Sequence, residues 1–108
     1  GQPAGALRIE LWRIERGDDD ERRTLIRTQI TNNDGRTDEP MLAGDEMTAG
    51  LYELVFFVGQ YFADRGNANA EIPFLDRVPV RFGISDPDSH YHVPLLTSPW
   101  AYSTYRGS

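Results

Sequence analysis

The chain contains no cysteine and no lysine among its 108 residues. Without cysteine it has no disulfide framework, no thiol nucleophile and no cysteine-based zinc site. Without lysine it has no amine for Schiff-base catalysis, and every permanently charged basic side chain is an arginine. Histidine, hydroxyl, carboxyl and guanidinium groups therefore remain for chemistry, and packing must supply the stability.

Positive charge is scarce as well, since the formal net charge is −6 at pH 7. Nucleic-acid binding depends on clustered cationic side chains, so we expect no nucleic-acid partner. No apolar run approaches the ~20 residues of a membrane-spanning helix, and no signal peptide is visible at Gly1. We expect no membrane association and a cytoplasmic location. A chain of this length forms one domain with a modest core, which would gain from oligomerisation.

Helical periodicity is almost absent, and short runs of alternating apolar residues predict an all-β domain. The run 51–58 is apolar on both of its alternating faces, so we expect a strand covered on both sides at the centre of the core. Pro79 restricts the run 78–84 to a sheet edge or a bulge, because proline cannot donate to a strand ladder. The strands predicted before the C-terminal segment are residues 7–12, 24–31, 51–58 and 78–84.

The connecting segments are less informative. Residues 15–23 are charged and include a run of aspartates, which we interpret as a solvated hairpin tip rather than a metal or partner site. Residues 59–66 have room for a single helical turn, and residues 41–49 are ambiguous. Short strands at these intervals predict a β-sandwich, and on pattern alone an immunoglobulin-like sandwich fits as well as any other.

Both histidines lie near the C-terminal end of the chain, in the run His-Tyr-His-Val-Pro-Leu-Leu over residues 90–96. His90 and His92 would project from the same face of a strand, because they are two residues apart. Residues 98–101 have turn character and would bring residues 102–105 back alongside the histidines. A His-x-His strand also suits a pair of metal ligands, but no third ligand is visible and we expect no metal.

The last four residues of the sequence are Tyr105-Arg106-Gly107-Ser108, and they follow that His-x-His-x-Pro-Leu run. This combination resembles the end of the 5-hydroxyisourate hydrolases, the transthyretin-related enzymes of urate breakdown. Transthyretin itself, a hormone carrier, shares their fold but is not expected to carry the tetrapeptide. The resemblance implies a single transthyretin-like (prealbumin-like) domain over residues 1–108, a β-sandwich of two antiparallel sheets with one short helix. It also implies edge-paired dimers that form a homotetramer with active sites at the subunit interface.

The implied activity is the hydrolysis of 5-hydroxyisourate to 2-oxo-4-hydroxy-4-carboxy-5-ureidoimidazoline, a step of purine degradation in which water attacks a ring carbonyl. The resemblance assigns His92 to catalysis, and an imidazole of pKa ~6.5 can accept a proton from water at neutral pH. It places His90 nearby as a substrate-binding residue with a less defined role. Tyr105 would contact the substrate, and the Ser108 hydroxyl would position the water. No cofactor is implied.

These residues also have ordinary structural interpretations. A strand histidine is commonly a satisfied, partly buried polar group, and a serine at the end of a chain is commonly frayed. The sequence has no Gly-x-Ser-x-Gly motif, so we do not interpret Ser108 as an acyl-forming nucleophile.

Arg36 follows Asp34-Gly35, an ordinary hairpin turn after which an arginine usually faces solvent. From spacing alone it is a structural residue. The run Thr-Asn-Asn-Asp-Gly-Arg over residues 31–36 nevertheless resembles the family's Thr-Asn-x-Asp-Gly-Arg motif, whose arginine reaches into the active site. The resemblance therefore makes Arg36 both a ligand for the substrate's carbonyl oxygens and a stabiliser of developing oxyanion charge.

One departure from the family concerns the start of the chain. The family begins with a strand that carries a Thr-His-Val-Leu-Asp-like motif, and residues 1–5 resemble the segment after that strand. We expect the natural protein to start upstream of Gly1, with a strand inside a sheet and a histidine that would share protons with His92. The competing hypotheses are a non-catalytic transthyretin-like small-molecule carrier and an inactive, truncated paralogue. Loss of the terminal motif would favour either, and the motif is intact.

Overall fold

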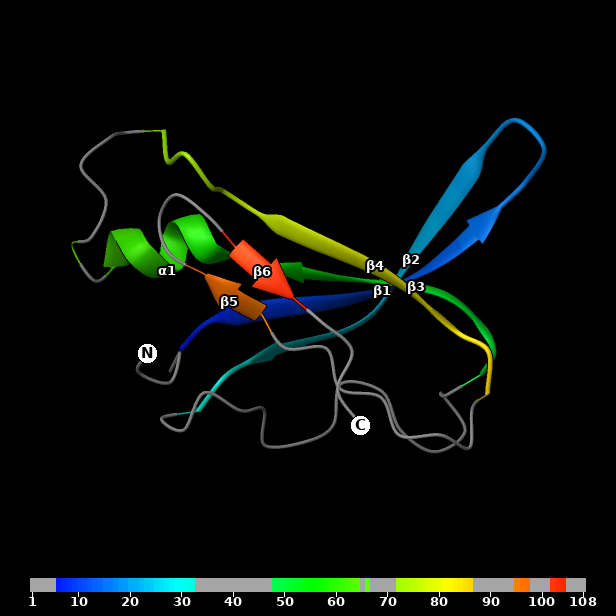
Figure 1. The fold of residues 1–108 in the computed structure, drawn as a ribbon, viewed down its shortest axis with the longest axis horizontal. Helices are drawn as coiled ribbons and strands as arrows, with labels where there is room; N and C mark the ends of the chain where they lie inside the picture. The colour runs from blue at the N-terminus through cyan, green and yellow to red at the C-terminus, as the bar shows by residue number, and fades with distance from the viewer. Residues whose placement is uncertain are drawn as a thin grey trace.

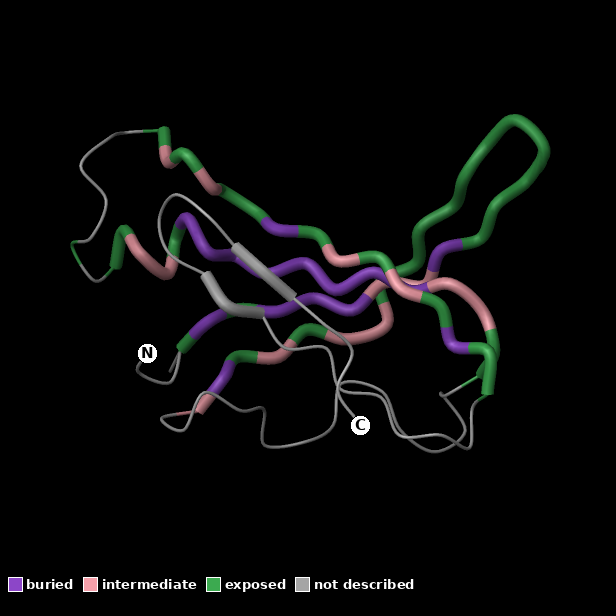
Figure 2. Tube along the Cα trace, in the orientation of Figure 1, coloured by how far each residue is buried: buried purple, intermediate pink, exposed green. Residues whose placement is uncertain are grey.

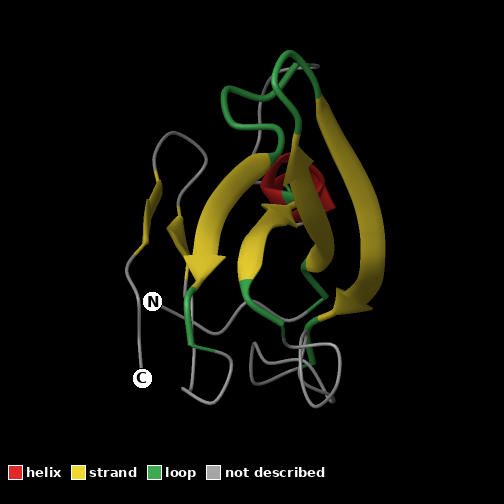
Figure 3. Cartoon of the chain, turned by 90° about the vertical axis from the view of Figure 1, so that its right-hand side faces the viewer, coloured by secondary structure: helices red, strands yellow, loops and turns green. Residues whose placement is uncertain are grey.

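The computed structural model describes residues 6–32, 48–64, 66 and 72–86, and the backbone of residues 95–97 and 102–104. Its elements are β1 (Arg8–Arg16), β2 (Glu21–Ile30), β3 (Gly50–Phe56), α1 (Val58–Asp64), β4 (Val78–Ile84), β5 (Leu95–Thr97) and β6 (Tyr102–Thr104). One antiparallel sheet has the order β2-β1-β3-β4, and β5 pairs antiparallel with β6 as a second layer (Figures 1 and 3). The predicted architecture of two antiparallel sheets and one short helix is confirmed.

The apolar core lies on one face of the four-stranded sheet. Ile9 and Leu11 of β1 lie opposite Phe56 and Leu54 of β3, and all four side chains are buried. Figure 2 shows that burial is concentrated on β1 and β3, the two inner strands. Among the described residues, the buried cluster consists of Leu7, Ile9, Leu11, Tyr52, Leu54, Phe56, Val58, Val78 and Ile84.

The central strand β3 is buried on both faces, as predicted. Tyr52 on the core face is fully buried, and Val55 on the other face is 6% exposed. The predicted strand over residues 51–58 was too long, because Val58 begins α1 instead. The helix was correspondingly underestimated, since its seven residues make about two turns at 3.6 residues per turn.

The charged segment 15–23 is a hairpin tip, as predicted, but it contains more strand than expected. Arg16 pairs with Glu21, so β1 and β2 continue almost to the turn. The Gly17 N–H donates to the Asp20 carbonyl at 2.8 Å, and this hydrogen bond closes the turn between the two strands. Residues 15–25 are all exposed, which fits the solvated interpretation. The extra strand was missed because these charged residues show no apolar alternation.

The remaining predictions have different outcomes. Pro79 lies in β4 at the edge of the sheet, as its missing N–H requires.

Residues 98–101 and most of the ambiguous segment 41–49 lie outside the described residues. The expected additional strand upstream of Gly1 stays a prediction. In the part of the chain that the structure describes, no helix is long and apolar enough to cross a membrane.

Candidate active site

All five residues predicted for the site lie outside the described part of the chain: His90, His92, Arg36, Tyr105 and Ser108. The structure does describe the strands that adjoin them. Leu95 lies opposite Thr104, and Thr97 lies opposite Tyr102. His92 lies three residues before the start of β5 and Tyr105 directly follows β6, so both are attached to the same end of this hairpin. The predicted hairpin is confirmed for these two strands, in which residues 102–104 lie alongside residues 95–97, and its extension alongside the histidines stays a prediction.

Arg36 belongs to the segment 33–47, whose upstream end is held at Thr31. The Thr31 side chain is buried, with 6% exposure. Its hydroxyl accepts a hydrogen bond from the Leu7 N–H at 2.9 Å. The Thr31 N–H donates to the Leu7 carbonyl at 2.9 Å, and the Thr31 carbonyl accepts from the Ala6 N–H at 2.8 Å. These bonds fix the end of β2 against the residues that lead into β1.

The downstream end of the same segment is held at Thr48 by two side chains of the sheet. The Tyr52 hydroxyl donates to the Thr48 carbonyl at 2.7 Å. Arg13 donates to the Thr48 and Tyr52 hydroxyls, both at 2.6 Å, and to the Ala49 carbonyl at 3.2 Å. A tyrosine that bonds backbone a few residues upstream is a recurrent way of fixing a corner in β-sandwiches.

The two anchors lie toward opposite ends of β1. Leu7 precedes this strand and Arg13 lies six residues further along it, about 20 Å at the rise of an extended chain. The segment that carries Arg36 therefore starts and finishes at points that are well separated and individually fixed. We expected neither anchor from the sequence, although Thr31 is the first residue of the motif that contains Arg36.

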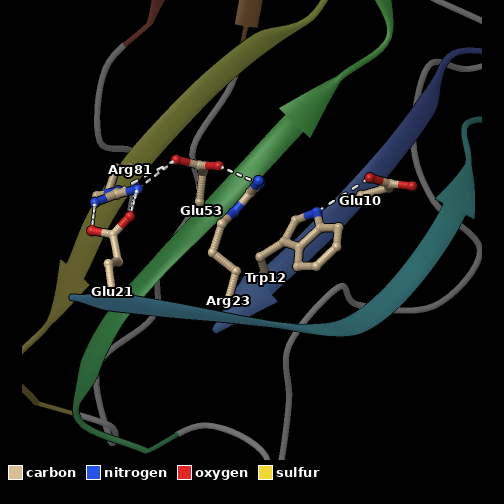
Figure 4. Close-up of polar contacts among 6 residues, drawn as sticks. All are labelled: Glu10, Trp12, Glu21, Arg23, Glu53 and Arg81. Atoms are coloured by element: carbon tan, nitrogen blue, oxygen red, sulfur yellow. Dashed lines mark hydrogen bonds and ion pairs between the residues drawn. The ribbon is translucent and has the colours of Figure 1, made fainter. Parts of the chain in front are cut away.

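A row of charged side chains crosses the other face of the sheet (Figure 4). Glu53 accepts hydrogen bonds from Arg23 at 2.8 Å and from Arg81 at 3.2 Å, and Arg81 also bonds Glu21. Glu21 on β2 reaches Arg81 on β4 although β1 and β3 lie between these strands in the sheet order. In Figure 4, β2 passes across the sheet toward β4, beyond a register shift between residues 11 and 12 of β1. Such irregularities bend a strand and increase its twist.

The row continues along β1. The Arg23 guanidinium lies 4.5 Å from the centre of the Trp12 ring, and the Trp12 N–H donates to Glu10 at 3.2 Å. Arg81 lowers the pKa of the Glu21 carboxyl by donating hydrogen bonds to it, and Glu21 in turn raises the pKa of Arg81. Because its carboxylates are bonded to cations or N–H groups, we interpret the row as structural rather than as a proton-transfer site.

Sequence reasoning missed this row because its pairs join different strands. Glu53 looks like one charge in an apolar strand, and only the pairing of all four strands of the sheet brings it to two arginines.

The chain matches the model of the HIUase/Transthyretin family over residues 1–107. It belongs to this family. A 5-hydroxyisourate hydrolase 2 of Rhizobium meliloti is 56% identical over 108 residues, which cover 100% of this chain and 87% of that protein. The resemblance inferred from the C-terminal motif is therefore confirmed.

Solved structures agree on the fold. A crystal structure of transthyretin from Sparus aurata has a TM-score of 0.81 at 27% identity, with 99% of this chain and 86% of that chain covered. A 5-hydroxyisourate hydrolase of Klebsiella pneumoniae has a TM-score of 0.72 at 28% identity, with coverage of 100% and 83%. A crystal structure of (S)-allantoin synthase has a TM-score of 0.88 at 50% identity. The match covers 100% of this chain but only 39% of that chain. The transthyretin-like sandwich is confirmed over an immunoglobulin-like one.

Proposed function

We propose that this chain hydrolyses 5-hydroxyisourate. The observation that carries the proposal is the 56% identity, over the whole chain, to a relative named 5-hydroxyisourate hydrolase 2. Shape alone does not separate hydrolase from carrier, because the transthyretin has the higher TM-score of the two, 0.81 against 0.72, at nearly equal identity. The sequence separates a hydrolase from a carrier, because this chain has the Tyr-Arg-Gly-Ser tetrapeptide that resembles the hydrolases and is not expected in transthyretin.

In the proposed reaction water adds to a ring carbonyl carbon, the adjoining amide C–N bond breaks, and the nitrogen leaves with a proton. His92 accepts the proton from the attacking water as general base. Arg36 binds the carbonyl oxygens and stabilises the negative charge that develops as water adds. Tyr105 and His90 contact the substrate, and Ser108 positions the water. The proposal needs no metal or cofactor.

The described hairpin supports a site that combines His92 with Tyr105. Each step along β5 toward the N-terminus is matched by one step along β6 toward the C-terminus. The same register, if continued, would set His92 opposite Gly107 and Tyr105 opposite Pro94. Directly paired residues project to one face of a sheet, so His92 and Tyr105 would share a face. Ser108 would fall on the other face, so its proposed role requires the chain to leave the ladder after Tyr105.

We further propose that the active form is a homotetramer with the sites at subunit interfaces. Both β2 and β4 are edge strands of the described sheet. Unpaired edges are a hazard that proteins reduce by pairing or covering them. Edge pairing between subunits would remove this hazard and could complete a site that one small domain leaves open.

His92→Asn tests the assignment of the base. We expect its turnover of 5-hydroxyisourate to fall by roughly 10²- to 10⁴-fold, the range typical of general acid–base catalysis. His90→Asn is the matched control and should lose much less. The measurement is the loss of 5-hydroxyisourate absorbance, made on variants whose melting temperature and oligomer size equal those of the natural protein. Equal losses from the two substitutions would overturn the assignment.

A further inference from the structure

Two arginines contact one buried phenylalanine on the face of the sheet opposite the core. Arg8 alternates along β1 with Ile9 of the core, so its side chain projects to that other face. The guanidinium carbons of Arg8 and Arg77 lie 4.6 Å and 4.5 Å from the centre of the Phe57 ring. Phe57 is 7% exposed, whereas both arginines are exposed. The ring therefore holds two cationic groups near each other at the surface, and we call these two residues the arginine pair.

The positive charge of the arginine pair is only partly balanced. Arg8 donates to Glu10 at 2.9 Å, and Glu10 also accepts the Trp12 N–H at 3.2 Å. Within the described part of the chain, the Arg77 guanidinium forms no hydrogen bond or ion pair, not even with its neighbour Asp76. One bonded carboxylate thus serves two arginines, although acidic residues outnumber basic ones in this chain.

The other end of the same face has a different charge balance. Arg23 and Arg81 lie there beside two carboxylates, because Glu53 accepts hydrogen bonds from both arginines and Glu21 accepts from Arg81. The guanidinium donors at that end are therefore used within the sheet. Donors that could bind an added anion lie at the arginine pair instead.

We propose that the arginine pair binds the phosphate group of a small molecule. The contact with Phe57 is a cation–π interaction, which uses the charge of a guanidinium and leaves its N–H donors available to an anion. Guanidinium forks match phosphate oxygens, and a phosphate dianion balances two guanidinium charges. Packing against the ring also restrains both side chains before the anion arrives, which reduces the entropy lost on binding. The site includes no residue of the proposed active site.

The test uses inorganic phosphate, titrated into the natural protein at a constant ionic strength that sodium chloride maintains. The NMR signal of the Trp12 indole N–H reports binding, because Glu10 bonds both this group and Arg8. A Trp12→Phe variant identifies the signal. We expect a saturable shift with a Kd in the millimolar range, since interactions between exposed charges are weak. A shift that is absent or does not saturate would overturn the proposal.

Three substitutions locate the site. Arg77→Gln removes one cation and should weaken phosphate binding about tenfold, the effect of a lost hydrogen bond between charged groups. Arg8→Gln should weaken it to a similar extent. Arg22→Gln is the matched control, because it removes the same charge from an exposed position of β2, and it should leave Kd unchanged.

The outcomes separate phosphate binding from a merely structural role of the arginine pair. If the two arginines only cover Phe57, their substitution lowers the melting temperature while the natural protein shows no saturable shift, and the proposal is wrong. It is equally wrong if Arg22→Gln weakens binding as much as Arg77→Gln does, because the general charge of the protein would then account for the effect. If Arg77→Gln does not fold, Arg8→Gln decides, and unchanged binding in that variant contradicts the site.

Discussion

Glu53 lies in the middle of the central strand with only 7% of its surface exposed. A buried carboxylate is unfavourable unless cations and hydrogen-bond donors compensate for its lost hydration. Arg23 and Arg81 do so from two other strands, and both retain contact with solvent. One glutamate therefore links three strands on the face opposite the core.

Glu21 gives this charged row a dependence on pH. Arg81 lowers the pKa of Glu21 in the folded protein below its ordinary value of 4.5. The unfolded chain then binds a proton at a higher pH than the folded one does, so this contribution to stability is present above pH 4.5 and is lost as the pH falls through the lowered pKa.

We expect Glu21→Gln to reduce the loss of stability on acidification, because glutamine does not titrate. Urea unfolding of both proteins between roughly pH 6 and pH 3 measures this slope, a range that covers the titration of carboxyl groups. Glu15→Gln, on the same exposed hairpin, is the control and should retain more of the original slope. An acid slope in Glu21→Gln equal to that of the natural protein would contradict the importance of the Arg81 contact.

At the scale of elements, α1 is fitted closely against the loop that leads into β4. The Gly59 N–H donates to the Asp76 carbonyl at 2.8 Å. A Cβ atom at Gly59 would come within 2.9 Å of Pro73 Cγ and 3.0 Å of the Leu75 carbonyl oxygen. Because one of these neighbours is backbone, the loop cannot yield by a simple side-chain rotation.

Gly59→Ala should therefore destabilise the protein by about 1 to 3 kcal/mol, the cost typical of overpacking. Helix propensity alone predicts the opposite sign, since alanine is favoured over glycine in a helix by about 1 kcal/mol. Gln60→Ala, at the next and exposed position of α1, should change the free energy of unfolding little. Denaturant titration of both variants measures their free energies of unfolding. A stabilised Gly59→Ala would contradict the close contact of residue 59 with Pro73 and Leu75.

Local patterns predicted the elements that depend on local residue types. The two-faced apolar run around Tyr52 identified β3, and Pro79 identified an edge strand. The strand content of the hairpin tip was not predictable in this way, because Arg16 and Glu21 belong to a ladder set by pairing rather than by apolar alternation. The boundary at Val58 was missed because an apolar residue fits either the end of a strand or the start of a buried helix.

At the scale of the whole molecule, only family motifs connected the proposed site residues. Arg36 and His92 are far apart in sequence, and neither spacing nor periodicity indicates that they meet. The described contacts add two fixed anchors for the segment that carries Arg36 and a paired hairpin beside His92. We proposed that the active sites lie at subunit interfaces of a homotetramer, and a fully active monomer would contradict that part of the proposal.

The most direct test of the central claim counts turnovers of 5-hydroxyisourate per chain, with substrate in large excess and the spontaneous decay subtracted. We expect many turnovers per chain, formation of 2-oxo-4-hydroxy-4-carboxy-5-ureidoimidazoline, and a rate that collapses in His92→Asn. A carrier would instead remove at most one equivalent of 5-hydroxyisourate per site and leave the rate of decay unchanged. Stoichiometric binding without turnover would contradict the proposed hydrolysis.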